Sequence, residues 1–172
     1  MTKKAITLMV DDQPVVFSFS DKEHALFLSL GAALAEIQSF ETSIAFWLSS
    51  LATKKAPKGK PSFEDEIIIH FEKTLGRLIK HFMLELHNKD IADLLEQVRI
   101  KRNHIVHNFL RANGWPLMSS TKYIAAIREI DDFRKFLADA EPAVCRHLSD
   151  KEKMNIRMLT YDPITGEIDI IV

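Results

Sequence analysis

Arg102, Asn103 and His107 are the residues of this chain best suited to chemistry. A histidine can act as general base or acid near neutral pH, and the planar guanidinium of arginine can donate two hydrogen bonds to a phosphate. An asparagine beside them can position a phosphate or a ribose hydroxyl. Together the three residue types indicate proton transfer next to a bound phosphate group.

The helix that carries these residues has a cation where a packed helix usually has an apolar residue. At about 100° per residue, Arg102 lies within one apolar stripe, which contains Ile91, Leu94, Leu95, Val98, Ile105 and Phe109. Asn103 and His107 lie at the edge of this stripe, about 40° apart. A cation that faces a core is unfavourable unless an acid pairs with it or a binding site surrounds it.

Glu41 is the acid predicted to pair with Arg102. It lies within about 20° of the centre of the apolar stripe on an earlier helix, as defined by Leu30 and Leu48. Because an unpaired buried charge is strongly destabilising, we expect an ion pair or hydrogen bond between Glu41 and Arg102. In the simplest alternative, Arg102 serves only to fix the register of two helices.

Periodicity and capping signals predict two helices in the first half of the chain. The first begins at Ser20 or Asp21 and runs to about Ala52, with an apolar face made of Leu26, Leu30, Leu34, Ile37, Ile44, Leu48 and Leu51. The second is capped by Ser62 and runs to about His87. Residues 53–61 between them are expected to form a solvated loop rather than a phosphate contact, although they include Lys54, Lys55, Lys58 and Lys60.

Two further helices are predicted in the second half. The third is capped by Asn88, carries the Arg102 motif and ends near Asn113 and Gly114. The fourth runs from about Ser120 to Leu148, and Pro142 is expected to kink or split it. Its apolar side contains Ile124, Ile127, Ile130, Phe133, Phe136 and Leu137.

Short extended segments flank the helices. Ala5 to Val10 and Val15 to Phe19 predict a strand pair, and Met158 to Tyr161 with Ile168 to Val172 predict a closing hairpin. The fold class expected is therefore mainly α, a four- to five-helix up-down bundle with short terminal strands. We expect a single domain over 1–172, with the helical core at about 21–148 and the terminal strands within 5–19 and 158–172.

Composition is that of an ordinary globular protein with no general attraction for nucleic acid. Of the 172 residues, 47% are hydrophobic and 27% charged, and the formal net charge is −1. Any RNA affinity must therefore come from a local patch, either the lysines of residues 53–61 or the predicted substrate-binding cations Arg99, Lys101 and Arg111 around the motif. The alternative is that these cations form an ordinary solvated helix face.

Cysteine usage and the hydropathy pattern indicate a cellular location. Cys145 is the only cysteine, so neither an internal disulfide nor a cysteine-based zinc cluster is expected, and it is interpreted as a small apolar helix residue. There is no leader-like N-terminus and no apolar run of about 18 residues. A soluble, cytoplasmic protein that is not associated with a membrane is expected.

The segment Arg102-Asn103-x-x-x-His107 resembles the Arg-x(4–6)-His motif of HEPN domains, in which a polar residue follows the arginine. The resemblance covers about residues 21–148. It implies a helical bundle with the motif on a late core helix, paired as a homodimer. Many members of the superfamily are metal-independent endoribonucleases of toxin–antitoxin and phage-defence systems.

What the resemblance implies for this chain is RNA cleavage without a metal or other cofactor. His107 would activate the ribose 2′-hydroxyl, Arg102 would stabilise the phosphate charge, and Asn103 would orient the substrate or the other two residues. Glu41, the acid predicted to pair with Arg102, would support it. The partners implied are RNA, a second subunit that completes a composite site, and an antitoxin protein. One departure is Phe109, because toxins partnered by a minimal nucleotidyltransferase antitoxin carry a tyrosine at that place.

Two other functions compete with this interpretation. His104 and His107 have spacing suited to a metal, and the chain also contains His70, His81 and His87, but no pair of Glu-x-x-His motifs accompanies them. Alternatively, the chain is a non-catalytic HEPN-like bundle that binds RNA, a nucleotide or a protein, or that only dimerises. The aromatic residues available for such an interface are Trp47, Trp115, Phe46, Phe82 and Phe109.

Overall fold

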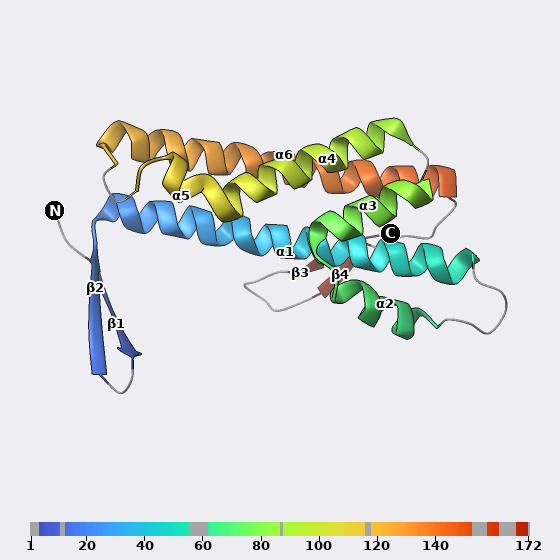
Figure 1. Cartoon of the computed structure of the whole chain (residues 1–172), viewed down its shortest axis with the longest axis horizontal. Coiled ribbons are helices and arrows are strands. Elements are labelled where there is room, and N and C mark those ends of the chain that lie inside the picture. Colours follow the sequence, from blue (N-terminus) through green and yellow to red (C-terminus); the bar gives the residue numbers. More distant parts are fainter. Residues whose placement is uncertain are drawn as a thin grey trace.

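The computed structural model describes residues 4–10, 13–55, 62–86, 88–115, 118–152, 158–161 and 168–171. Its fold is a mainly α-helical bundle with two separate two-stranded hairpins, which confirms the predicted fold class. Two long helices, α1 (Asp21–Lys55) and α6 (Ser120–Glu152), lie side by side and form the frame on which the shorter helices pack (Figure 1).

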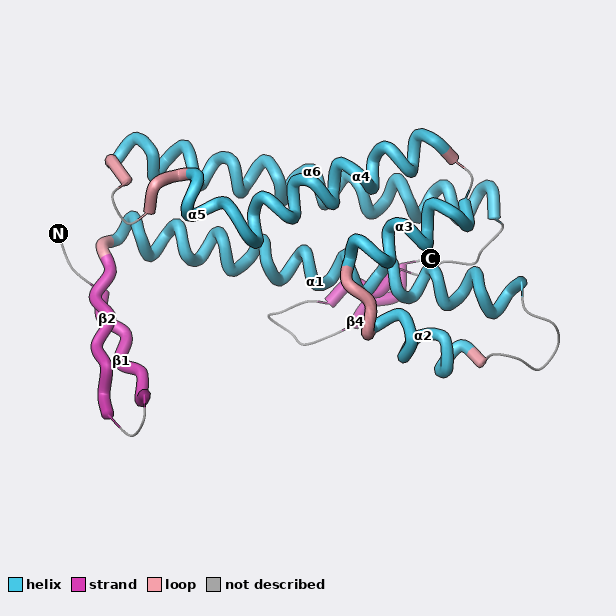
Figure 2. Tube along the Cα trace, viewed as in Figure 1, coloured by secondary structure: helices cyan, strands magenta, loops and turns pink. Residues whose placement is uncertain are grey.

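Both hairpins lie at the chain ends, as predicted. β1 (Lys4–Val10) pairs antiparallel with β2 (Gln13–Phe19), and Figure 2 shows this hairpin projecting away from the helices. β3 (Met158–Tyr161) pairs antiparallel with β4 (Ile168–Ile171). Residues 11–12, 162–167 and 172 lie outside the described residues. β2 begins at Gln13, two residues earlier than predicted, so Gln13 and Pro14 belong to the strand and not to the turn.

Helix α1 begins where its capping residue predicts and ends later than expected. The Ser20 amide N–H and hydroxyl both donate to Glu23 Oε2 at 2.8 Å, a local arrangement that fixes the first turn. The helix continues through Lys55, whose Nζ lies 2.7 Å from Glu85 Oε2, so two lysines of the predicted loop are helical. The rest of that loop, 56–61, is not described. Leu34 is 37% exposed and does not join the buried face predicted for it.

The second predicted helix is in fact two helices. Helix α2 (Phe63–Phe71) starts with the predicted cap, in which the Asp65 amide N–H donates to Ser62 Oγ at 3.2 Å. The chain then turns, and the Thr74 carbonyl accepts the first hydrogen bonds of α3 (Leu75–Leu86). The prediction of a single helix is wrong here. Both segments pack on α1, and the break at 72–74 changes which helix face is buried.

The third predicted helix has a change of geometry at the motif. Helix α4 (Lys89–Asn103) is capped as expected, with the Ile91 amide N–H donating to Asn88 Oδ1 at 3.1 Å. A π-helical turn, η1 (His104–Asn108), follows and leads into α5 (Phe109–Ala112). The predicted stop is confirmed, because Gly114 has a φ of 78°, which favours glycine.

Helix α6 continues through Pro142 without splitting. Because proline lacks the amide proton and crowds the carbonyl four residues earlier, it destabilises a helix interior. We expect Pro142→Ala to raise the free energy of unfolding by about 1–3 kcal/mol. Urea denaturation checks this, and a lower midpoint for Pro142→Ala would contradict it. On the same helix, Ile124 is 51% exposed and lies outside the buried side predicted for it.

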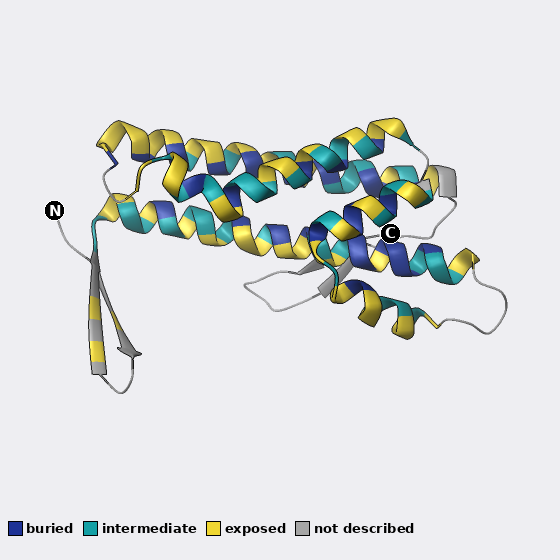
Figure 3. Ribbon diagram, in the orientation of Figure 1, coloured by how far each residue is buried: buried dark blue, intermediate teal, exposed yellow. Residues whose placement is uncertain are grey.

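The core lies where α1, α3, α4 and α6 meet, and Figure 3 shows buried positions recurring along the facing sides of these helices. Trp47, Phe82 and Phe109 belong to this core, so they are not available as interface residues, whereas Phe46 and Trp115 remain partly exposed. Cys145 is buried in α6 as expected, and burial, with a contribution from Glu141, raises the pKa of its thiol to about 11. Within the described residues, no helix is long and apolar enough to cross a membrane.

Candidate functional site

The predicted pair between Glu41 and Arg102 forms and links α1 to α4. Arg102 Nε donates to Glu41 Oε1 at 3.1 Å, and Arg102 Nη2 lies 3.1 Å from the same oxygen. The side chains remain 21% and 25% exposed, so the pair lies at the rim of the core rather than inside it. An arginine side chain is long enough to cover apolar surface with its stem while its guanidinium reaches the rim of the core.

The other side of the Arg102 guanidinium faces the two remaining motif residues. Arg102 Nη1 donates to Asn103 Oδ1 at 3.3 Å and lies 3.4 Å from His107 Nε2. Both distances are at the long end of the hydrogen-bond range. Arg102 therefore contacts Glu41 more closely than it contacts Asn103 and His107.

The π-helical turn is what brings Arg102 and His107 together. In a regular α-helix, residues five apart point about 140° away from each other. A π-turn is built on an i to i+5 repeat, so residues at this spacing lie one above the other. The expectation of a regular helix is wrong for this segment, because residues 104–108 adopt the π-helical repeat. The contacts instead make Arg102 the centre of the group.

The contact between Arg102 and His107 has a defined direction. Because an arginine N–H can only donate, Nε2 of His107 is the acceptor in this contact. His107 is exposed, and Arg102 and Asn103 are half-buried. An imidazole nitrogen thus lies beside a guanidinium in a site open to solvent.

The three predicted substrate-binding cations each contact a different neighbouring side chain and do not cluster at Arg102. Arg99 Nε donates to Glu96 Oε2 at 2.8 Å, and Lys101 Nζ lies 5.3 Å from the centre of the Phe136 ring on α6. Arg111 Nη2 donates to Asn108 Oδ1 at 2.9 Å. Lys101 and Arg111 are exposed, so the surface near the motif does carry positive charge.

A histidine–glutamate pair near the motif was not predicted from the sequence. His104 Nε2 lies 2.8 Å from Glu129 Oε1 on α6, and its ring makes an edge contact with Phe109, with 6.1 Å between centroids. His104 and His107 thus have different neighbours, one on α6 and one in the motif. No local sequence signal identifies this pair, because Glu129 is 25 residues away and its nearness depends on how α4 and α6 pack.

The predicted metal alternative receives no support from side-chain positions. Among the described residues, no group of three or more histidine, cysteine, aspartate or glutamate side chains is arranged to hold a metal ion. His87 lies outside the described residues.

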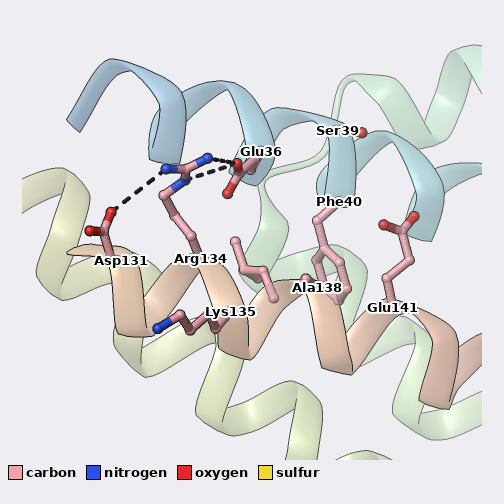
Figure 4. Close-up of a pocket in the computed structure, with 9 residues that line it drawn as sticks. Glu36, Ser39, Phe40, Asp131, Arg134, Lys135, Ala138 and Glu141 are labelled. Atoms are coloured by element: carbon pink, nitrogen blue, oxygen red, sulfur yellow. Dashed lines mark hydrogen bonds and ion pairs between the residues drawn. The ribbon is translucent and has the colours of Figure 1, made fainter. Parts of the chain in front are cut away.

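A separate pocket of about 620 Å³ lies between α1 and α6. Figure 4 shows Arg134 reaching from α6 toward Glu36 and Asp131, with Phe40 lining the apolar part. Arg134 Nε donates to Glu36 Oε1 at 2.9 Å, so this arginine ties the two long helices together. The motif residues are not part of its lining. We interpret the charged groups of this pocket as an interhelical tie.

Comparison of the chain with models of known protein families, with curated proteins and with solved structures finds no match.

Proposed function

We propose that this protein is a metal-independent endoribonuclease of the HEPN type. The observation that carries the proposal is the position of Arg102, which is anchored by Glu41 on one side and directs Nη1 at Asn103 and His107 on the other. Anchoring the guanidinium before substrate arrives favours catalysis, because little reorganisation is then needed when charge develops on the phosphate.

The chemistry proposed is attack of a ribose 2′-hydroxyl on the adjacent phosphorus. His107 Nε2 takes the proton from the 2′-oxygen as the new oxygen–phosphorus bond forms. Arg102 donates hydrogen bonds to the non-bridging oxygens, whose negative charge grows. The bond to the 5′-oxygen then breaks, and that oxygen takes up a proton from an acid or water. The products are a 2′,3′-cyclic phosphate and a 5′-hydroxyl.

The partners belong to the same proposal. RNA is the substrate, and exposed Lys101 and Arg111 supply positive charge beside the motif. A second copy of the chain would bring a second His107 to a composite site and provide the acid that the leaving 5′-oxygen needs. An antitoxin protein would control the activity in a toxin–antitoxin or phage-defence setting.

Cleavage of RNA in the presence of a chelator tests the proposal. The purified chain is incubated with a labelled single-stranded RNA and excess EDTA, and the products are resolved with their end groups. We expect cleavage that resists EDTA and leaves 2′,3′-cyclic phosphate ends. His107→Ala should slow cleavage by at least about 100-fold, because loss of a general base typically costs a factor of 10²–10⁴.

His104→Ala is the matched control, because His104 lies in the same π-helical turn but contacts Glu129. We expect this variant to retain cleavage within about threefold of the unmodified chain. EDTA-sensitive cleavage, or an undiminished rate in His107→Ala, would contradict the mechanism. No cleavage by the unmodified chain, together with retained RNA binding, would favour the non-catalytic HEPN-like bundle.

A further inference from the structure

Helix α2 is fastened to the bundle through a buried histidine. Of its nine residues, His70 alone is buried, and it is 0% exposed. Ile68 and Phe71 on the same helix are 61% and 53% exposed. Rings on α2 also contact Phe46 of α1, with centroids 5.6 and 6.0 Å away, but Phe46 is itself 40% exposed. The most buried part of the attachment is therefore an imidazole.

The hydrogen bonds of His70 define its neutral form. His70 Nδ1 lies 3.0 Å from Ser49 Oγ on α1, and that hydroxyl donates its single proton to the Ala45 carbonyl at 2.8 Å. Nδ1 must therefore carry a proton and donate it to Ser49. Nε2 is then unprotonated, and it is buried with no hydrogen-bond partner in the described structure.

The charged groups around His70 are not placed to accept a hydrogen bond from a second ring proton at Nε2. Glu66 Oε2 lies 3.8 Å from Nδ1, on the side that already faces Ser49. The ring of His81 on α3 lies 5.4 Å away, and Lys73 follows α2 in the turn. Burial lowers the pKa of His70, and Lys73 and His81 lower it further against the effect of Glu66. A proton added at Nε2 would create a buried cation whose new N–H has no acceptor.

We propose that His70 makes the attachment of α2 sensitive to pH, so that mild acid releases residues 63–71 from α1 while α1 and α6 stay packed. The attachment is complete above the ordinary histidine pKa of about 6.5 and weakens as the pH falls toward the lower pKa of the attached state. Detached α2 would lose its helix, because nine residues are too few for a stable isolated helix. Release would also uncover the α1 surface at Ser49, which is 0% exposed and contacts His70.

Hydrogen exchange measured between pH 7.5 and 5.0, and corrected for intrinsic rates, tests the proposal on the unmodified chain. Below about pH 6.5 we expect the opening constant of segment 63–71 to rise by up to about tenfold per pH unit. Segment 123–137 of α6 should keep its protection. Unchanged protection of 63–71, or parallel loss in both segments, would overturn the proposal.

Two variants separate His70 from the other titrating groups. His70→Met keeps an apolar side chain and removes the titration, so protection of 63–71 should no longer depend on pH. His104→Gln, at a histidine paired with Glu129, should leave the pH dependence unchanged. A pH dependence that survives in His70→Met, or disappears in His104→Gln, would refute the role of His70. Nitrogen-15 NMR of the unmodified chain at pH 7.5 adds an independent readout, and a proton on Nε2 instead of Nδ1 would also overturn the proposal.

Discussion

Arg102→Ala is expected to slow RNA cleavage by about 10²–10³-fold, the usual effect of removing one preorganised donor from a developing negative charge. Arg102→Lys is not expected to restore the rate. A guanidinium can hold Glu41 through Nε and Nη2 while Nη1 faces the substrate, whereas an ammonium is a single point charge. Initial cleavage rates at saturating RNA, with thermal unfolding of each variant, provide the measurement.

Arg134→Ala is the matched control for this prediction. Like Arg102, Arg134 joins a glutamate of α1 and remains partly exposed, but it lies outside the motif. We expect its cleavage rate to stay within about twofold of that of the unmodified chain. Each substitution leaves a partly exposed glutamate unpaired, which costs about 1 kcal/mol or less. Equal losses of activity in the two variants, or near-normal activity in Arg102→Lys, would contradict the role proposed for Arg102.

Phe109→Ala is expected to lower the free energy of unfolding by about 3–5 kcal/mol, the usual cost of truncating a buried phenylalanine. Phe109 is 1% exposed and directly follows the π-helical turn that holds His107. Removing its ring would leave a cavity beneath this turn and remove the edge contact with His104. Urea denaturation followed by circular dichroism measures the change.

Phe71→Ala provides the comparison, because the same substitution at this site removes a ring that is 53% exposed. Its expected cost is about 1 kcal/mol or less, since most of the side chain is in contact with water in the folded state. Similar costs at positions 71 and 109 would show that the core does not extend under the π-helical turn as described.

Much of the helical frame could be predicted because its signals are local. Ser62 and Asn88 cap helices through hydrogen bonds to residues three positions away, and Gly114 supplies a positive φ within its own residue. The break at 72–74 lacks a local signal of this kind, because these three residues include neither glycine nor proline. It arises because two segments must each place a different face against α1.

The Glu41–Arg102 pair could also be predicted, because both residues lie on apolar faces of long helices whose phase can be followed along the sequence. The contact between Arg102 and His107 could not be predicted in the same way, since a regular helix would place these two side chains about 140° apart. In this structure, the π-helical turn η1 brings side chains at this five-residue spacing into contact.

The amino-acid sequence alone determined where α1, α2, α4 and α6 begin, which acid meets Arg102 and which residue types form the motif. Only tertiary packing decided that Lys101 and His104 reach α6 and that His70 docks on Ser49, whereas the contact between Arg102 and His107 depends on the π-helical turn. The reason is the distance along the chain over which each kind of interaction acts. Caps and periodicity act within one or two turns, whereas the partner of a side chain depends on a helix that lies tens of residues away.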